Sequence, residues 1–360
     1  MSIQFLGMIG HRLSSETIAP AGPIFDKQYI ARFAKAHEDA GFDRILVGYW
    51  SDQPDGFLVT ALAGLSTSRI NFLLAHRPGF VAPTVAARKL ATLEHLLDGR
   101  LAVHIISGGS DADQRKDGDQ LDHDQRYARS DEFLDVLKHT WTSDKPFDYH
   151  GEHYRVEQAF SAIKPLQQPH LPVYFGGSSE AALQVAGKQA DVFMLWGEPL
   201  AQAAETIAAV RAEAQRHGRE IEFSLSFRPI LGRTEEEAWA RAESILASAS
   251  ERIGDSAFPK AKPQSVGAQR LLRAVEQGDR LDDRLWTGIA RLVGGGHNST
   301  ALVGTPEQVA DALLAYYDLG VRNFLIRGFD PLNDAVEYGR ELLPLTRAKV
   351  AERERQRASA

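Results

Sequence analysis

The sequence contains no cysteine in its 360 residues. Disulfides, thiolate metal sites and cysteine nucleophiles are therefore excluded, and nothing points to an oxidising compartment. No apolar run approaches the roughly 18 residues of a membrane span. The first residues, MSIQFLGMIG, lack a basic region before their short apolar run, and no small-residue cleavage pattern follows. We therefore expect a cytoplasmic protein with no membrane partner.

Basic residues are too few for a polyanionic partner. The chain has 41 Lys and Arg against 48 Asp and Glu, a formal net charge of −7. Nucleic acids and anionic membranes are bound by clustered Lys and Arg, so we expect neither as a partner of the whole surface. The patterns HxH and HExxH do not occur, and neither does the GxSxG turn of serine hydrolases. We predict no metal site.

Short, nearly continuous apolar runs alternate with longer segments of helical period along the whole chain. Such runs are typical of strands that are buried on both faces of a parallel sheet. Eight strand-and-helix units in a chain of this length favour a (β/α)₈ TIM barrel over an open doubly wound sheet. The predicted strands are residues 3–10, 44–49, 70–76, 100–109, 171–177, 191–197, 221–231 and 323–329.

Two stretches interrupt this alternation. Residues 143–168, which contain FDYHGEHYRVEQAF, are predicted to form an inserted hairpin. Residues 248–298 are too long for a plain connection and are predicted to form a lid-like excursion, with glycine hinges in GGGHNS at 294–299. We expect a single barrel domain over residues 1–350 and a C-terminal tail over 351–360.

The segment PVYFGGSSEAALQVA, residues 172–186, joins a predicted strand to a helix through two glycines and two serines. Free backbone N–H groups at a helix N-terminus favour a phosphate, and the hydroxyls of Ser178 and Ser179 add two donors. Gly177 would let the backbone approach such a ligand closely. A serine before a helix is, however, often only a helix cap. On the residues alone, both interpretations stay open.

In a barrel the active site lies at the carboxyl ends of the strands. Arg228 would be costly there without an anionic partner, and a structural carboxylate and a ligand are equal alternatives. His76 and His104 lie on apolar strands, where a lone histidine is more often a core residue than a ligand. The candidates at strand ends are His11, Arg12, Asp52, Gln53, His76, Arg77, Ser107–Ser110, Gly177–Ser179, Trp196, Ser226, Arg228, Arg327 and Phe329.

Five segments resemble, in order and spacing, the bacterial-luciferase-like flavin monooxygenases, and among them the alkanesulfonate monooxygenase group. They are RPGFVAPTVAARKLATLEHLLDGRLAVHIISGG, DGDQLDHDQRYARSDEF, PVYFGGSSEAA, ADVFMLWGEP and TALVGTPEQVADALLAYYDLGVRNFLIRGF. The resemblance implies a TIM barrel that binds reduced FMN, supplied by a separate NAD(P)H-dependent reductase. With O₂, this cofactor would oxygenate a small organic substrate. It also implies a homodimer or homotetramer.

The resemblance implies a cofactor site as well. The glycine–serine turn would hold the FMN phosphate, assisted by a tyrosine and a histidine at the start of another helix. Ser107 stands where relatives usually have threonine, beside the flavin ring. The residues expected to contact the cofactor are Ala75, His76, Ser107, His123, Tyr127, Gly177, Ser178 and Ser179.

The substrate side follows the resemblance less closely. Its expected catalytic residues are His11, Trp196 and Arg228. His11 is the candidate for orienting a peroxide or moving a proton, because imidazole titrates near neutral pH.

Four residues differ from those of the sulfonate enzymes. Gln53 replaces a cysteine, Ser226 an arginine, Arg228 a histidine and Phe329 a tyrosine. The substrate is therefore left open between an organosulfonate, a related organosulfur compound and another small molecule. A deazaflavin-dependent oxidoreductase of the same fold and a non-catalytic flavin-binding protein are the alternative functions.

Overall fold

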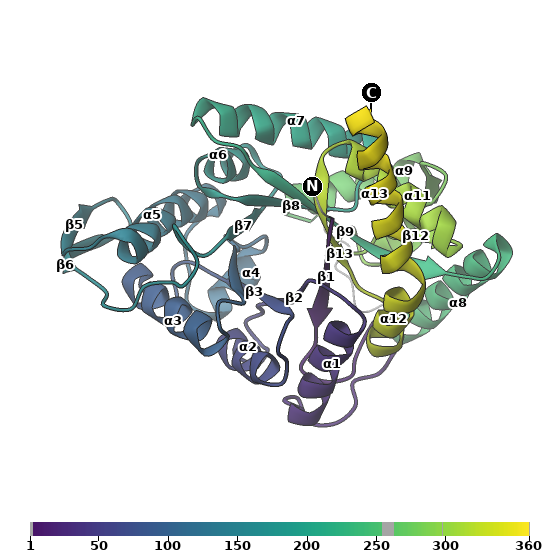
Figure 1. The fold of residues 1–360 in the computed structure, drawn as a ribbon, viewed down its shortest axis with the longest axis horizontal. Helices are drawn as coiled ribbons and strands as arrows, with labels where there is room; N and C mark the ends of the chain where they lie inside the picture. Colours follow the sequence, from purple (N-terminus) through teal and green to yellow (C-terminus); the bar gives the residue numbers. More distant parts are fainter. Residues whose placement is uncertain (1–2, 254–262, 297, 360) are drawn as a thin grey trace.

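Eight parallel strands form a barrel in the computed structural model, which describes residues 3–253, 263–296 and 298–359 (Figure 1). The strands are β1 (Gln4–Ile9), β2 (Arg44–Val47), β3 (Asn71–His76), β4 (Leu101–Ile105), β7 (Val173–Gly176), β8 (Val192–Trp196), β9 (Glu222–Leu231) and β13 (Val321–Ile326). Each pairs with the next, and pairing of β13 with both β9 and β1 closes the ring. The predicted (β/α)₈ barrel is confirmed.

Helices cover the outside of this ring (Figure 1). The last helix includes residues 351–359, which were predicted as a tail. No helix in the described ranges is long and apolar enough to cross a membrane. The helices around the barrel are α1 (Lys27–Asp39), α2 (Gly56–Leu65), α3 (Pro83–Leu96), α4 (Asp111–Lys116), α5 (His123–Thr142), α6 (Glu180–Gln189), α7 (Leu200–Arg216), α8 (Glu235–Ile253), α11 (Pro306–Asp318), α12 (Pro331–Glu337) and α13 (Leu343–Ser359).

Capping residues in the sequence fix where several helices begin. The Asp122 side chain accepts from the Gln125 N–H, and the Gln125 side chain accepts from the Asp122 N–H, so that a capping box starts α5. Thr305 and Gln308 form the same box before α11. Each side-chain cap contributes about 1 kcal/mol to helix stability. The first cap also sets the position of Tyr127, one turn into α5.

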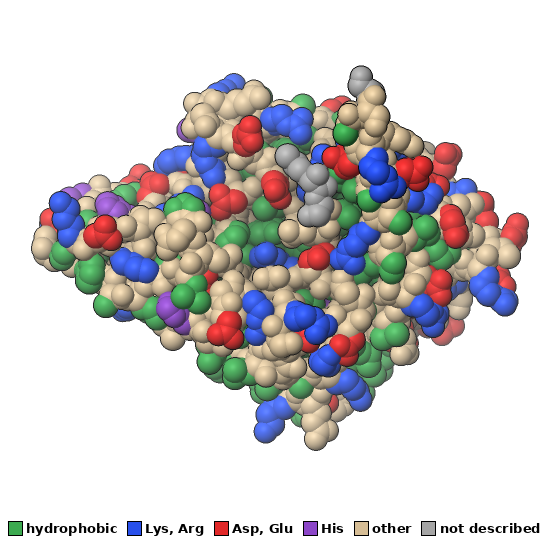
Figure 2. Space-filling view, viewed as in Figure 1, with side chains coloured by type: hydrophobic (Ala, Val, Ile, Leu, Met, Phe, Trp, Pro, Cys, Tyr) green, Lys and Arg blue, Asp and Glu red, His purple; other side chains and the backbone are tan. Residues whose placement is uncertain are grey.

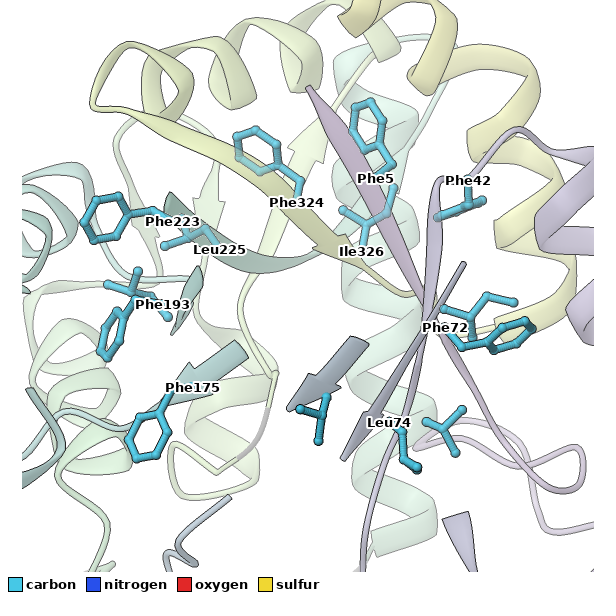
Figure 3. Close-up of a cluster of buried hydrophobic side chains, with 14 of the residues drawn as sticks. Phe5, Phe42, Phe72, Leu74, Phe175, Phe193, Phe223, Leu225, Phe324 and Ile326 are labelled. Carbon is cyan, nitrogen blue, oxygen red and sulfur yellow. The ribbon is translucent and has the colours of Figure 1, made fainter. Parts of the chain in front are cut away.

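Side chains alternate along the strands and form two apolar layers. Phe5, Phe72, Phe175, Phe223 and Phe324 point outward and pack between the barrel and its helices (Figure 3). Burying one such ring contributes about 1.5–3 kcal/mol. The inward layer is a separate cluster made of Leu6, Leu46, Leu73, Ala102, Tyr174, Val192 and Leu325. This alternation decides which residues near the strand ends can face the barrel mouth.

The predicted hairpin is present. Strands β5 (Phe147–His150) and β6 (Arg155–Ala159) pair antiparallel, and Figure 1 shows them projecting beyond α5 at one edge of the molecule. The Glu132 carboxylate of α5 accepts hydrogen bonds from three N–H groups in the turn, those of Glu152, His153 and Tyr154. The hairpin is thus fastened to a barrel helix.

The excursion at 248–298 contains secondary structure. Its described part holds the end of α8, α9 (Val266–Gln277), β10 (Arg280–Leu281), β11 (Leu285–Trp286) and α10 (Gly288–Leu292). β9 continues past the barrel, and its last four residues pair with β12 (Ala301–Gly304), to which β11 adds. Residues 254–262 and His297, within the predicted hinge, lie outside the described residues.

Acidic and basic side chains are interspersed over the face of the molecule seen in Figure 2. That face presents no broad area of one charge sign among the described residues, and long-range attraction of a polyanion needs such an area.

Candidate active site

The glycine–serine turn lies at the carboxyl end of β7. Ser179 is the N-cap of α6, and its Oγ accepts a hydrogen bond from the Ala182 N–H at 3.2 Å. The cap interpretation is therefore correct for Ser179. The Ser178 hydroxyl has no hydrogen-bond partner within the described ranges, and neither do the N–H groups of Glu180 and Ala181. The turn thus combines a satisfied cap with several unused donors.

Gly177 is required by the space around it. Its φ of +145° lies in a region that side-chain-bearing residues rarely adopt. A Cβ at this position would lie 2.5 Å from the Tyr127 hydroxyl oxygen and 2.6 Å from the Ala182 Cβ. Both distances are too short for any side chain, so the turn keeps its shape only with glycine here.

Tyr127 reaches the same turn from the start of α5, and His123 packs beside Tyr127. Burial raises the pKa of Tyr127 to about 12, and a hydrogen bond with the Ser179 side chain acts in the opposite direction. The Tyr127 hydroxyl therefore keeps its proton at neutral pH. The His123 ring lies 4.9 Å from the Tyr127 ring, and its Nδ1 is 2.7 Å from the Asp124 carboxylate.

The start of α9 lies against the same turn. A Cβ on Gly267 would be 3.1 Å from the Trp196 ring and 3.4 Å from the Ser178 Oγ. Arg270 of α9 makes two hydrogen bonds to the Glu198 carboxylate, at 2.7 and 2.6 Å. Trp196 and the excursion are therefore brought to the mouth of the barrel, next to the unused donors.

The residues expected beside the flavin ring separate into two groups. Ala75 lies two residues after Leu73 on β3, so both side chains face the barrel interior. The His76 side chain points outward, 5.9 Å from the Phe57 ring and 5.4 Å from the Phe133 ring. Burial lowers the pKa of His76 to about 4. The His76 imidazole therefore belongs to the layer under the helices, and only its backbone can border the mouth.

Ser107 is also turned toward a helix. Its buried Oγ lies 2.8 Å from the Ser130 Oγ of α5. Ser130 donates its hydroxyl hydrogen to the Arg126 carbonyl, so Ser107 must be the donor in the bond between the two serines. The Ser107 side chain then has only acceptor capacity left for a ligand.

His11 and Gln53 adjoin at the ends of β1 and β2. Burial and the neighbouring Arg12 lower the pKa of His11, and a hydrogen bond with the Gln53 side chain acts in the opposite direction. The imidazole is therefore mostly neutral at pH 7 and can accept a proton. The structure thus brings together one predicted catalytic residue and one predicted pocket residue.

Arg228 is held by a carboxylate that the sequence did not reveal. Its Nη1 lies 2.8 Å from the Glu16 Oε1, and its Nη2 donates to the Gly328 carbonyl at 2.9 Å. The guanidinium carbon stands 3.5 Å from the centre of the Phe329 ring, and the whole residue is 0% exposed. Of the two alternatives for Arg228, a ligand and a structural carboxylate, these contacts favour the structural carboxylate. The guanidinium of Arg228 also stacks on the buried ring of Phe329.

Ser226 Oγ and the His104 Nδ1 are among the inward-facing polar atoms that lack partners within the described residues. The sequence predicts His104 as a core histidine. The His104 Nε2 would be 3.5 Å from a Cβ on Gly176, so this ring lies beside the start of the glycine–serine turn. Burial lowers the pKa of His104 to about 4. The described part of the chain contains no cluster of three or more His, Asp or Glu that could hold a metal.

The sequence matches the model of the luciferase-like monooxygenase family over residues 3–323. The chain therefore belongs to the luciferase-like monooxygenase family.

Several solved structures share the fold at low sequence identity. A riboflavin lyase, RcaE, solved with modified FMN and riboflavin, has a TM-score of 0.80 at 20% identity, covering 97% of this chain and 92% of that one. EDTA monooxygenase (EmoA) from Chelativorans sp. BNC1 gives 0.77 at 19%, covering 97% and 94%. An F420-dependent secondary alcohol dehydrogenase gives 0.68 at 16%, covering 96% and 99%. These likenesses show the fold of the chain.

Proposed function

We propose that this protein is a two-component monooxygenase that binds reduced FMN, supplied by a separate NAD(P)H-dependent reductase, and oxygenates a small organic substrate. The observation that carries the proposal is the glycine–serine turn with its unused donors. Family membership and the FMN named for the riboflavin lyase structure support the choice of cofactor. When bound, the reduced flavin supplies the electrons that activate O₂.

The turn fits a phosphate monoester. Ser178 offers a hydroxyl without a partner, α6 offers two N–H groups and the positive end of its dipole, and Gly177 places no side chain in the way. Tyr127 stays protonated because its pKa is about 12, and it would donate its hydroxyl hydrogen to a phosphate oxygen. These donors would hold the phosphate and so fix where the rest of the cofactor lies.

His11 is our candidate for handling the proton of the reaction. Because its pKa is lowered, the imidazole is a base at neutral pH, and Gln53 orients the ring through one of its nitrogens. Trp196 would supply an apolar wall, since its ring packs on Gly267 of α9. The excursion would then exclude water from the mouth of the barrel.

An oxygenation assay tests the proposal. The purified protein is incubated with an FMN reductase, NADH, O₂ and, one at a time, a panel of sulfonates, sulfones and carboxylates. Substrate-dependent oxygen incorporation with FMN supports it. Turnover with a reduced deazaflavin alone would favour the F420-dependent alternative, and FMN binding with no oxygenation of any substrate would favour a binding protein.

Removing the carboxylate that holds α9 should loosen the excursion. In Glu198→Gln, Arg270 loses its charge-assisted bonds, each of which contributes about 1.5–3 kcal/mol. We expect amide exchange in α9 to quicken roughly 10- to 100-fold, measured by hydrogen–deuterium exchange. Glu276→Gln, an exposed change on the same helix, should leave exchange as it is. Equal exchange in Glu198→Gln and the unchanged protein would show that this ion pair does not fasten α9.

We also propose that the protein is a homodimer or homotetramer. Large apolar side chains are exposed on the neighbouring barrel helices α2 and α3, among them Leu58, Leu65 and Leu96. Covering them with a second copy of the chain would bury apolar area that water otherwise solvates. Light scattering on the purified protein measures the assembly directly.

A further inference from the structure

Two arginines share one carboxylate at the carboxyl ends of β9 and β13. Glu16, from the loop after β1, contacts Arg228 at 2.8 Å and Arg327 at 3.2 Å. All three groups are largely removed from solvent, and the cluster carries one more positive than negative charge. Removing an unbalanced charge from water is costly, so such a cluster favours the approach of an anion.

Other arginines at this end of the barrel are balanced differently. Four of them each have a carboxylate that no second arginine contacts among the described residues, whereas Arg327 shares the carboxylate of Glu16 with Arg228. Those pairs are Arg77–Asp113, Arg126–Asp111, Arg129–Asp119 and Arg270–Glu198.

Arg327, unlike Arg228, remains accessible. Its side chain is 24% exposed, whereas that of Arg228 is 0% exposed. The Nη1 of Arg327 makes one contact within the described ranges, with the Met8 sulfur at 3.8 Å, which is a weak acceptor. Met8 packs against the inward-facing cluster of the barrel, so this Nη1 lies at the barrel interior. Burial and the nearby Arg228 lower the pKa of Arg327, and the charge of a bound anion would offset both effects.

We propose that Arg327 binds a negatively charged oxygen group of the substrate, a carboxylate or a sulfonate, while Arg228 and Glu16 form the fixed ion pair that supports it. This inference rests on the proposed function and names the substrate class of that site. It assigns anion binding to Arg327, whose N–H group can reach a ligand. For Arg228 the sequence left a ligand and a structural carboxylate as equal alternatives. Arginine suits such a group because it stays charged and its donors lie in one plane.

The test measures binding by calorimetry to protein saturated with FMN, so that the phosphate turn is already filled. The probes are acetate, butanoate and octanoate, the sulfonates of the same chain lengths, and the alcohols of those lengths as neutral controls. The variants are Arg327→Met, which removes the charge, and Arg327→Lys, which keeps it. The ion pair between Glu16 and Arg228 remains in both variants, so we expect both variants to fold. Thermal melting checks this.

We expect at least one acid to bind the unchanged protein more tightly than its alcohol. Arg327→Met should weaken that acid about 10- to 100-fold, the range of one charge-assisted hydrogen bond, and Arg327→Lys should weaken it less. The alcohols should bind equally to all three proteins. The relative affinities of the carboxylates and sulfonates identify which oxyanion the site takes.

The inference is overturned if no acid binds, if acids and alcohols bind alike, or if Arg327→Met binds the acids as the unchanged protein does. Repeating the titrations without FMN separates the two proposals. Failure of FMN to bind would count against the flavin function alone, while Arg327-dependent selectivity for the acids would still support the anion site.

Discussion

Glu16→Gln is expected to destabilise the folded protein by about 3–5 kcal/mol, the usual effect of breaking a buried ion pair by removing one partner. The change leaves Arg228 and Arg327 next to each other with no carboxylate between them. Urea unfolding at pH 7 measures the loss. Glu237→Gln is the matched control, because its ion pair with Arg233 is on the surface and should contribute little.

The same variant has a pH signature. Arg228 and Arg327 lower the pKa of the Glu16 carboxyl far below its ordinary value of 4.5, although burial alone would raise it. A carboxyl group whose pKa is lower in the folded state stabilises the protein at pH values above its pKa in the unfolded state. This stabilisation decreases as the pH falls below the unfolded-state pKa. The stability difference between the unchanged protein and Glu16→Gln should therefore shrink below about pH 4.5. A difference that stays constant down to acid pH would contradict the ion-pair assignment.

Gly177→Ala is expected to abolish measurable FMN binding. The new Cβ would require a strained φ of +145° and would overlap the Tyr127 hydroxyl at 2.5 Å, so the turn and Tyr127 must move apart. Displacing both removes the donors that we assign to the phosphate. Quenching of FMN fluorescence on titration with protein measures the binding.

The control for that variant is Gly218→Ala. Gly218 also has a positive φ, +65°, but a Cβ there meets nothing within 4 Å. It should cost about 1–2 kcal/mol of stability from backbone strain without changing FMN binding. If Gly177→Ala binds FMN as Gly218→Ala does, the turn at Gly177 does not hold the phosphate.

The sequence predicted the barrel because each strand is a short apolar run, but the same property hid which residues face inward. Strands buried on both faces carry no polar alternation. His76 was therefore grouped with Ala75 beside the flavin, although neighbouring residues on a strand point to opposite sides. The inward register became visible only when Leu73 was seen in the inner cluster.

Contacts between distant parts of the chain were equally hidden. Arg228 indicated that it needed an anion, but its partner Glu16 lies 212 residues away in an unremarkable loop. The long run IEFSLSFRPIL predicted one strand, and nothing in it showed that its last residues pair with β12 instead of the barrel. The glycine–serine turn was easier to predict from the sequence than these long-range contacts. Gly177 and Ser179 act through backbone geometry and helix capping, which depend on adjacent residues.

The most direct test of the phosphate site compares FMN with riboflavin, which has the same ring system and lacks the phosphate. We predict that the protein binds FMN at least about 100-fold more tightly than riboflavin, since two or more charge-assisted hydrogen bonds depend on the phosphate. Ser178→Ala should weaken FMN and leave riboflavin unchanged. Equal affinity for the two flavins, or an equal effect of Ser178→Ala on both, would contradict the assignment of the glycine–serine turn.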